Sequence, residues 1–323
     1  MNNPALRGRL APSPTGLLHL GNAWAFWLAW LEARRAGGRL VLRLEDLDPA
    51  RSRAAHAEGI RRDLAWLGLD WDEEAPPQSR RAPAYEAALA GLAARGLTYP
   101  CFCSRRDLRS LAGAPQVGDA GAAYAGTCRS LSPERRAALA ASGRARAVRL
   151  ACPPERVWRF RDRAAGPQGL TLAECGGDFA LRRSDGVFAY QLAVVVDDLD
   201  QGVTSVVRGR DLLLSTPRQL YLQELLGGPA PDYAHVPLIL DHQGERLAKR
   251  HAGLALAALR EAGARPEDIF GFLAHLAGFR DRPGPLAPGD LAPGFAWDRL
   301  RAEDLRLPES LAGRPAEVLA GGA

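Results

Sequence analysis

A short stretch near the N-terminus, residues 9–22, combines residue types that packing alone does not explain. It reads Arg-Leu-Ala-Pro-Ser-Pro-Thr-Gly-Leu-Leu-His-Leu-Gly-Asn, and an apolar run long enough for a buried helix follows it. Its prolines and Gly16 predict a tight turn between a strand and that helix. Gly21 permits close approach of a ligand to the backbone, and the amides at a helix start and His19 suit a phosphate. The stretch predicts a nucleotide site, and a purely structural histidine is the alternative.

A second candidate is a single residue. The chain has 42 lysine and arginine residues, and only Lys249, within Arg246-Leu247-Ala248-Lys249-Arg250, is a lysine. A compact, flexible ammonium reaches a phosphate as a point charge, which the planar guanidinium does not imitate. We therefore interpret Lys249 as a phosphate ligand, with chance as the alternative.

Carboxylates follow the next expected strand. Residues 39–44 alternate as a strand does and run directly into Glu45, Asp46 and Asp48. Ligands of open α/β sheets bind at the carboxyl ends of the strands, so we expect Glu45 in a binding site. For Asp48, which precedes a proline, helix capping is the competing interpretation.

Three of the five cysteines gather in one region. Cys101, Cys103 and Cys128 lie within 28 residues, around a loop rich in glycine and alanine. Thiols spaced in this way predict a metal site, and Tyr124 or Cys152 is available for a fourth tetrahedral position. Free buried cysteines are the alternative.

Positive charge is concentrated in the middle of the chain. The net charge is +5 and the pI about 9.2. Residues 129–163 contain ten arginines against Glu134, Glu155 and Asp162, with Trp158 and Phe160 between them. This segment predicts a surface that follows RNA phosphates, or else a solvated basic face.

The elements expected around these residues alternate between strands and helices. With 323 residues and 47% hydrophobic content, the chain can bury a full core as one domain with an insertion or as two domains. We expect helices near 54–67, 82–95 and 216–226, the last capped by Ser215, and strand-like segments at 179–183, 187–192, 194–198, 202–211 and 235–240. About 70 residues then form a small helical region.

No apolar stretch is long enough to cross a membrane, and the N-terminus lacks a signal-peptide pattern, so we expect a cytoplasmic protein without membrane contact. The composition changes at Pro100 and again near Asp178. We therefore divide the chain into residues 1–99, 100–177, 178–240 and 241–323.

The first stretch resembles the HIGH-type signature of class I aminoacyl-tRNA synthetases, in the form typical of the glutamyl and glutaminyl branch, with Asn22 replacing the second histidine. The segment 246–250 resembles the second signature of that class, with Arg246 and Ala248 departing from its pattern. The blocks at Glu45 to Asp48, 197–198, 208–211 and 235–237 are similar to the glutamyl-tRNA synthetase core. The resemblance implies an α/β fold with a Rossmann-type parallel sheet, and residues 1–99 and 178–240 would form its two halves. Residues 100–177 would be an inserted subdomain that binds zinc and contacts RNA. Residues 241–323 would carry the second signature and a small C-terminal helical region.

The resemblance also implies roles for individual residues. Catalysis would depend on His19 and Lys249, and ATP with Mg²⁺ would be bound by His19, Gly21, Asn22 and Lys249. Glutamate would be bound by Arg9, Leu10, Ala11, Pro12, Ser13, Glu45, Tyr190 and Arg208, with the arginines on its carboxylates and Glu45 on its ammonium. A structural zinc ion would be held by Cys101, Cys103, Tyr124 and Cys128.

Since the sequence stops where an anticodon-binding domain would begin, it most resembles the glutamyl-queuosine tRNA(Asp) synthetases. That family implies activation of L-glutamate and transfer to the queuosine base in the anticodon of tRNA(Asp), and we expect a monomer. The alternatives are a short glutamyl-tRNA synthetase charging tRNA(Glu), a coenzyme-forming nucleotidyltransferase, and a non-catalytic RNA-binding module derived from a synthetase.

Overall fold

The computed structural model describes residues 5–104, 106–108, 124–247, 252–312 and 314–319. Its first elements are the predicted strand, loop and helix: β1 (Arg7–Leu10) is followed by α1 (Leu20–Arg35). Two of the tryptophans of α1, Trp24 and Trp27, are buried and donate their indole N–H groups to the carbonyl oxygens of Pro237 and Pro288. The apolar run thus forms a central helix of the core.

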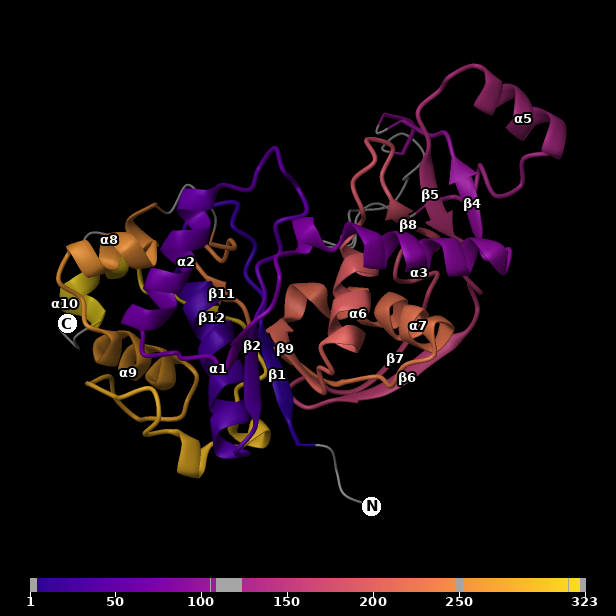
Figure 1. Ribbon diagram of the computed structural model, residues 1–323. Coiled ribbons are helices and arrows are strands. Elements are labelled where there is room, and N and C mark those ends of the chain that lie inside the picture. The colour runs from indigo at the N-terminus through magenta and orange to yellow at the C-terminus, as the bar shows by residue number, and fades with distance from the viewer. Residues whose placement is uncertain (1–4, 105, 109–123, 248–251, 313, 320–323) are drawn as a thin grey trace.

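Parallel strands form the centre of the molecule. β1 pairs with β2 (Arg39–Leu42), and β2 pairs with β3 (Glu73–Glu74). β9 (Ser205–Gly209) pairs with β10 (Asp232–Val236). β9 lies beside β1, where the Thr204 amide donates to the Arg7 carbonyl at 2.9 Å (Figure 1). The carboxyl ends of β1, β2 and β9 therefore meet at one edge, although residues far apart in the sequence supply them.

Two groups of helices cover this sheet. The core that includes α1 and α2 (Ala54–Trp66) is completed by the C-terminal helices α8 (Leu256–Glu261), α9 (Pro266–Leu276) and α10 (Pro315–Leu319). A second core packs α3 (Ala82–Ala94), α6 (Tyr190–Asp200) and α7 (Thr216–Leu226) together. Figure 1 shows these groups on opposite sides of the central strands. None of the helices in the described ranges is long and apolar enough to span a bilayer.

A segment between α3 and α6 projects from this body. β4 (Thr98–Cys101), β5 (Ala147–Leu150) and β8 (Phe179–Arg182) form an antiparallel sheet, and α5 (Pro133–Ala141) lies beyond it at the upper right of Figure 1. A hairpin of β6 (Val157–Asp162) and β7 (Gly166–Thr171) turns back to the body, where the Arg163 amide donates to the Tyr233 carbonyl beside β10. The short pair β11 (Ile239–Leu240) and β12 (Leu305–Arg306) joins the C-terminal region to the core.

Several expected elements differ in the structure. Residues 187–192 and 194–198 were expected to be strand-like, but Tyr190–Asp200 is the helix α6. Gln191 to Asp198 are all buried, so the helix has no polar face, and a short apolar run without a polar face does not distinguish a helix from a strand. Ser215 precedes α7 as expected, but its side chain does not cap the helix and instead accepts a hydrogen bond from Gln191.

Candidate functional site

The loop after β1 places His19 at the N-cap of α1. Its Nδ1 accepts a hydrogen bond from the Gly21 amide at 3.1 Å, and the Asn22 side chain accepts one from the His19 amide at 3.0 Å. A Cβ atom at position 21 would lie 3.1 Å from the imidazole ring, so glycine is needed there for this ring position. Asn22 therefore closes a capping box that fixes His19. This capping role was not anticipated from the sequence.

The chain on either side of Lys249 lies near this helix start. The Leu256 amide donates to the Leu18 carbonyl at 2.8 Å, and Ala255 forms an isolated β-bridge with His19. On the other side, Arg246 pairs with Asp211 at 2.6 Å, just after β9. Lys249 itself lies outside the described residues. The described segments on its two sides contact the His19 loop and the residues that follow β9.

Arg9, on β1, is a buried cation with unused donors. Its side chain is 5% exposed, and its Nη1 donates to the Val207 carbonyl at 2.8 Å. Its Nε is buried without a hydrogen-bond partner in the described part of the chain. Burial lowers the pKa of Arg9. Asp198 raises this pKa, and the neighbouring cations Arg43 and Arg208 lower it further. An anionic ligand would relieve this shortage of partners.

Arg208, on β9, is equally buried but is differently bonded. It donates through Nε to His235 at 2.9 Å, through Nη1 to Gln219 at 2.8 Å and through Nη2 to Thr216 at 2.9 Å. A longer contact of 3.4 Å links Nη1 to the Tyr190 hydroxyl. All three nitrogens of Arg208 are thus occupied by the protein, in contrast to those of Arg9.

Arg208, His235 on β10 and Asp162 form a buried chain of three residues, and sequence reasoning gave His235 and Asp162 no role. The His235 Nδ1 lies 2.6 Å from Asp162, at the end of β6. Burial lowers the pKa of His235 to about 4, although Asp162 opposes that shift. A neutral ring donates from Nδ1 to Asp162 and accepts from Arg208 at Nε2, so the chain sets both the tautomer and the position of the guanidinium.

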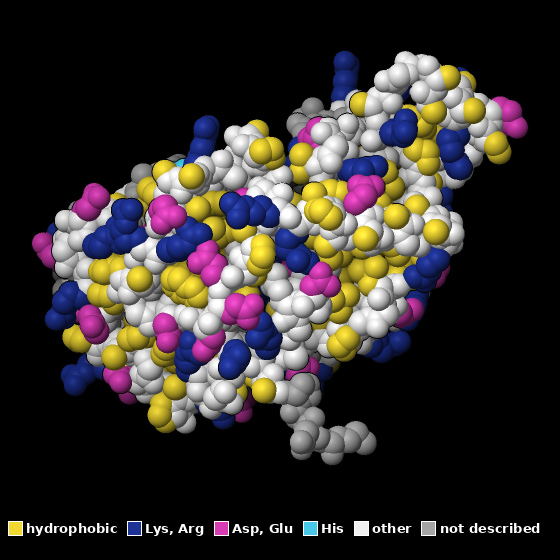
Figure 2. Space-filling model, in the orientation of Figure 1, with side chains coloured by type: hydrophobic (Ala, Val, Ile, Leu, Met, Phe, Trp, Pro, Cys, Tyr) yellow, Lys and Arg dark blue, Asp and Glu magenta, His cyan; other side chains and the backbone are white. Residues whose placement is uncertain are grey.

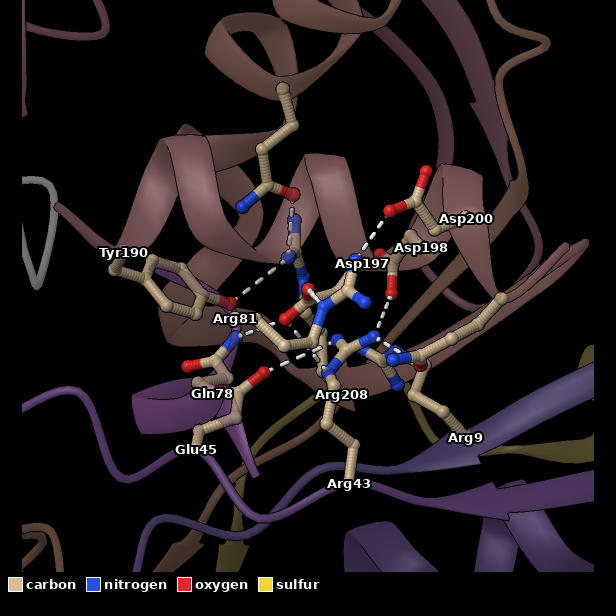
Figure 3. A network of polar contacts seen from close by, with 12 residues as sticks. Arg9, Arg43, Glu45, Gln78, Arg81, Tyr190, Asp197, Asp198, Asp200 and Arg208 are labelled. Carbon is tan, nitrogen blue, oxygen red and sulfur yellow. Dashed lines mark hydrogen bonds and ion pairs between the residues drawn. The ribbon is translucent and has the colours of Figure 1, made fainter. Parts of the chain in front are cut away.

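Glu45 faces the two arginines from the end of β2, and Figure 3 shows the group. Its side chain is 9% exposed and pairs with Arg43 at 3.2 Å. Burial raises the pKa of Glu45, while Arg43 and Arg9 lower it and Asp198 raises it further. The Tyr190 hydroxyl completes the group. Burial and Glu45 raise the pKa of Tyr190, and Arg208 lowers it. The structure therefore brings Arg9, Glu45, Tyr190 and Arg208 into one cluster.

The loop predicted to line this cluster runs beside it. The Glu45 amide donates to the Pro12 carbonyl at 3.0 Å, and the Arg43 amide donates to the Leu10 carbonyl at 2.9 Å. Leu10 and Pro12 are buried, Ala11 is partly buried and Ser13 is exposed. The loop after β1 and the carboxyl end of β2 thus form adjacent sides of the candidate pocket.

The cysteine site is a separate cluster in the projecting segment. The Sγ atoms of Cys101, Cys103 and Cys128 lie within 4.8 Å of one another. The Tyr124 hydroxyl accepts from the Cys128 amide at 2.8 Å and lies 3.5 Å from the Cys101 sulfur. Tetrahedral zinc with Zn–S bonds of about 2.3 Å separates its sulfurs by about 3.8 Å. The 3.6 Å between the sulfurs of Cys103 and Cys128 fits this geometry.

Electrostatics also distinguish the cluster from Cys152, the other candidate for the fourth ligand. Burial raises the pKa of the Cys152 thiol to about 12, and its sulfur contacts the Leu150 carbonyl. Burial would also raise the pKa of Cys101, but contacts with Tyr124, the Cys103 backbone and Arg149 lower it. The guanidinium of Arg149 lies 3.9 Å from the centre of the Tyr124 ring. Tyr124, rather than Cys152, therefore lies beside the thiols.

The ten arginines of residues 129–163 do not form one continuous surface. Arg149 is buried, and Arg129, Arg156 and Arg163 pair with acidic residues. Arg159 and Arg161 are exposed on β6 and have no ion pair with any described residue. Figure 2 shows basic side chains spread over both parts of one face, with acidic side chains between them.

The parallel sheet, the capped histidine and the buried arginine and carboxylate cluster define a nucleotide-binding α/β enzyme site. Residues 5–282 match the family model for tRNA synthetases class I (E and Q), catalytic domain. The chain therefore belongs to the class I tRNA synthetases of the E and Q type. The expected family and fold class are confirmed.

Within that family, the chain is similar to proteins named Glutamyl-Q tRNA(Asp) synthetase. It is 58% identical over 293 residues to the protein from Nitratidesulfovibrio vulgaris, covering 88% of this chain and 90% of that one. It is 51% identical over 312 residues to the protein from Symbiobacterium thermophilum, covering 94% and 96%. A crystal structure of a glutamate tRNA ligase from Elizabethkingia meningosepticum superposes with a TM-score of 0.78 at 26% identity, covering 95% of this chain and 68% of that chain.

Proposed function

We propose that this enzyme activates L-glutamate with ATP and transfers the glutamyl group to the queuosine base in the anticodon of tRNA(Asp). The observation that carries this proposal is the identity of 58% and 51%, over almost the whole length, to proteins named for that activity. The cluster of two arginines and one carboxylate supports the amino-acid half of the reaction. The queuosine half depends on the relatives alone.

Activation joins a carboxylate oxygen of glutamate to the α-phosphorus of ATP while the bond to pyrophosphate breaks. This in-line displacement needs positioning and stabilisation of oxygen charge more than acid or base catalysis. His19, Gly21 and Asn22 would hold the phosphates at the start of α1, and Lys249 would neutralise charge on the departing pyrophosphate. Mg²⁺ bound with ATP would supply further neutralisation of the phosphate oxygens.

For glutamate, we propose that Arg9 is the main carboxylate ligand. Its Nε has no partner among the described residues, whereas Arg208 is already bonded through every nitrogen. Arg208 would add positive charge and hold Tyr190 at the pocket wall. Glu45 would bind the ammonium, and residues 10–13 would form the adjoining wall.

In the projecting segment, we propose that Cys101, Cys103, Cys128 and Tyr124 hold a structural zinc ion. Three thiols at this spacing with one oxygen fit the ligand number and geometry of zinc. The four-part division of the chain at residues 100, 178 and 241 is likewise a proposal. It agrees with the projection seen in Figure 1, although the antiparallel sheet there also uses β4 and β8 at the proposed borders.

The test is incorporation of labelled glutamate, with ATP and Mg²⁺, into two pools of bulk tRNA. One pool comes from cells that make queuosine and the other from cells that cannot. We expect label only in the first pool. Label in both pools on a terminal adenosine would indicate a glutamyl-tRNA synthetase, and no label in either would indicate a non-catalytic RNA-binding module.

A further inference from the structure

A buried arginine outside the predicted site lies directly behind Glu45. Arg43 is 0% exposed and directly follows β2, two residues before Glu45. Its Nη2 lies 3.2 Å from Glu45 Oε1, and its Nη1 donates to Asp198 at 2.7 Å. We propose that Arg43 is a positioning residue for the substrate's ammonium, because it holds Glu45 in place and keeps it ionised. This inference rests on the proposed activation of glutamate.

The hydrogen bonds of Glu45 show how Glu45 and Arg43 would each contribute to binding the ammonium of the substrate. Among the described residues, Arg43 is its hydrogen-bond partner through Oε1, and Oε2 makes no hydrogen bond or ion pair with any of them. A carboxylate has acceptor sites on both oxygens, so Oε2 can accept from an ammonium while Arg43 keeps Oε1. Arg43 thereby fixes the rotation of the carboxylate without itself touching the ligand.

Arg43 is itself held from the other half of the sheet. Asp198 and Gln201, about one turn apart at the end of α6, accept from its Nη1, and Asp198 lies 155 residues along the chain from Arg43. The neighbouring Asp197 accepts from Gln78 and Arg81 (Figure 3). It also accepts from Tyr85 of α3, so these contacts fix that end of α6 against α3. Since α6 also begins with Tyr190, the same bridge sets the distance between Glu45 and the opposite pocket wall.

The charges around Glu45 make this support necessary. Arg43 on its own segment and Arg9 on β1 favour the ionised carboxylate, whereas burial and Asp198 on α6 oppose it. Removing Arg43 leaves Asp198 uncompensated beside Glu45 and removes the strongest attraction. The pKa of Glu45 then rises further, and a protonated carboxyl attracts an ammonium only weakly.

The experiment compares L-glutamate with glutarate, which lacks only the amino group. Dissociation constants are measured by titration calorimetry between pH 6.5 and 8.5 for the wild type, Arg43→Gln and Asp198→Asn. Arg260→Gln is the matched control, because it breaks a 2.8 Å ion pair with the buried Asp63 remote from the pocket. The Michaelis constants for glutamate and ATP are measured in parallel by ATP–pyrophosphate exchange.

We expect Arg43→Gln to weaken glutamate binding about tenfold or more near neutral pH, in line with the loss of a charged hydrogen bond. Glutarate binding should change little, and glutamate affinity should recover as the pH rises through the raised pKa of Glu45. Asp198→Asn should weaken glutamate binding to a smaller degree, because Arg43 loses its 2.7 Å partner. It should not show the recovery with rising pH, because it also removes a negative charge that raises the pKa of Glu45. This variant keeps the proposal testable if Arg43→Gln does not fold. The Michaelis constant for ATP should stay constant.

Equal losses of glutamate and glutarate affinity would overturn the proposal, since they would indicate a general structural effect. Unchanged glutamate affinity in both variants would overturn it as well. If the wild type bound no glutamate, the proposed function would fail first, and that result is distinct from either outcome.

Discussion

The proposed glutamate pocket and the cysteine cluster are built in opposite ways. In the pocket, Arg9 on β1 donates to the carbonyl of Val207 on β9, 198 residues further along the chain. In the cluster, the sulfurs of Cys103 and Cys128 belong to residues only 25 positions apart and lie 3.6 Å from each other. The proposed pocket therefore depends on assembly of the whole sheet, whereas the cluster joins residues that are close in the sequence.

The proposed pocket and the cysteine cluster also differ in how their ionisable groups are compensated by neighbouring residues. In the proposed pocket, Arg43 is paired with Glu45 and Asp198, while the Nε atoms of Arg9 and Arg43 are buried without hydrogen-bond partners among the described residues. In the cluster, burial and the neighbouring thiols raise the pKa of Cys103 to about 12. Without a cation this thiol stays protonated at neutral pH, and a metal would replace its proton.

The largest effect is expected from Arg9→Gln, which removes the cation with unused donors. The glutamate Michaelis constant should rise about 100-fold or more, as is usual when one partner of a buried ionic contact is lost. Folding should be retained, because only one internal hydrogen bond of Arg9 disappears. Glutamate-dependent ATP–pyrophosphate exchange and thermal unfolding provide the two measurements.

Arg208→Gln is the informative counterpart. It removes bonds to His235, Gln219 and Thr216, so its main consequence should be a lower melting temperature. If Arg9→Gln destabilised the fold more than Arg208→Gln did, the assignment of Arg9 as the ligand-binding member of the pair would be wrong.

Two substitutions of His19 separate its role as the N-cap of α1 from its proposed role in binding the phosphates of ATP. His19→Ala should lower exchange about 100-fold, as does loss of a donor to developing oxygen charge, and should cost about 1 kcal/mol of stability through the lost cap. His19→Asn should keep the cap, since asparagine is a good N-cap residue, but should still lose the activity. Full exchange activity in His19→Asn would show that capping is the only role of this side chain. The same loss of exchange is expected for Lys249→Ala.

How much of the fold and of the candidate site could be predicted from the sequence depends on how far apart in the sequence the contacting residues lie. The strand, loop and helix around His19 were predicted because proline, glycine and the apolar run act locally. The helix α6 was missed because its valines and the buried Asp197 and Asp198 leave no polar face to reveal a period. The sequence identified Asp197 and Asp198 as part of a block similar to the synthetase core, but it did not identify their partner, Arg43.

Arg43 and His235 show the limit more clearly. In the sequence, Arg43 is one arginine of an alternating strand, and only the folded sheet places it between Glu45 and Asp198. Likewise, nothing near Arg208 in the sequence indicates that every one of its nitrogens is already bonded. Residue types identified the candidate ligands, but tertiary contacts decide which donors remain for a substrate.

Removal of metal should affect the two regions differently. Elemental analysis should find one zinc per chain in protein purified without chelators, and Cys103→Ser should lower that content. The glutamate Michaelis constant in exchange should stay within about twofold, because the two sites share no partner, while glutamylation of RNA should fall. A parallel loss of glutamate affinity would show that the cluster and the pocket form one unit. Absence of zinc from the wild type would remove the metal proposal.

The smallest effect concerns the outer face of β6, where two arginines lie side by side. Arg159 and Arg161 pair across the hairpin with Gly169 and Pro167, so neither arginine faces a long side chain on β7. Two residues along a strand span about 7 Å, a spacing that lets two cations contact neighbouring phosphates of one RNA strand.

We expect the double substitution Arg159→Gln and Arg161→Gln to weaken tRNA binding and to reduce the slope of log affinity against log salt by about two, one for each lost phosphate contact. Exchange without RNA should not change. Arg156→Gln is the matched control, since that arginine is already paired with Glu224 at 2.7 Å. An equal salt slope in the double variant and the control would assign this face to solvent, and RNA contacts would then have to be sought on the remaining arginines of the projecting segment.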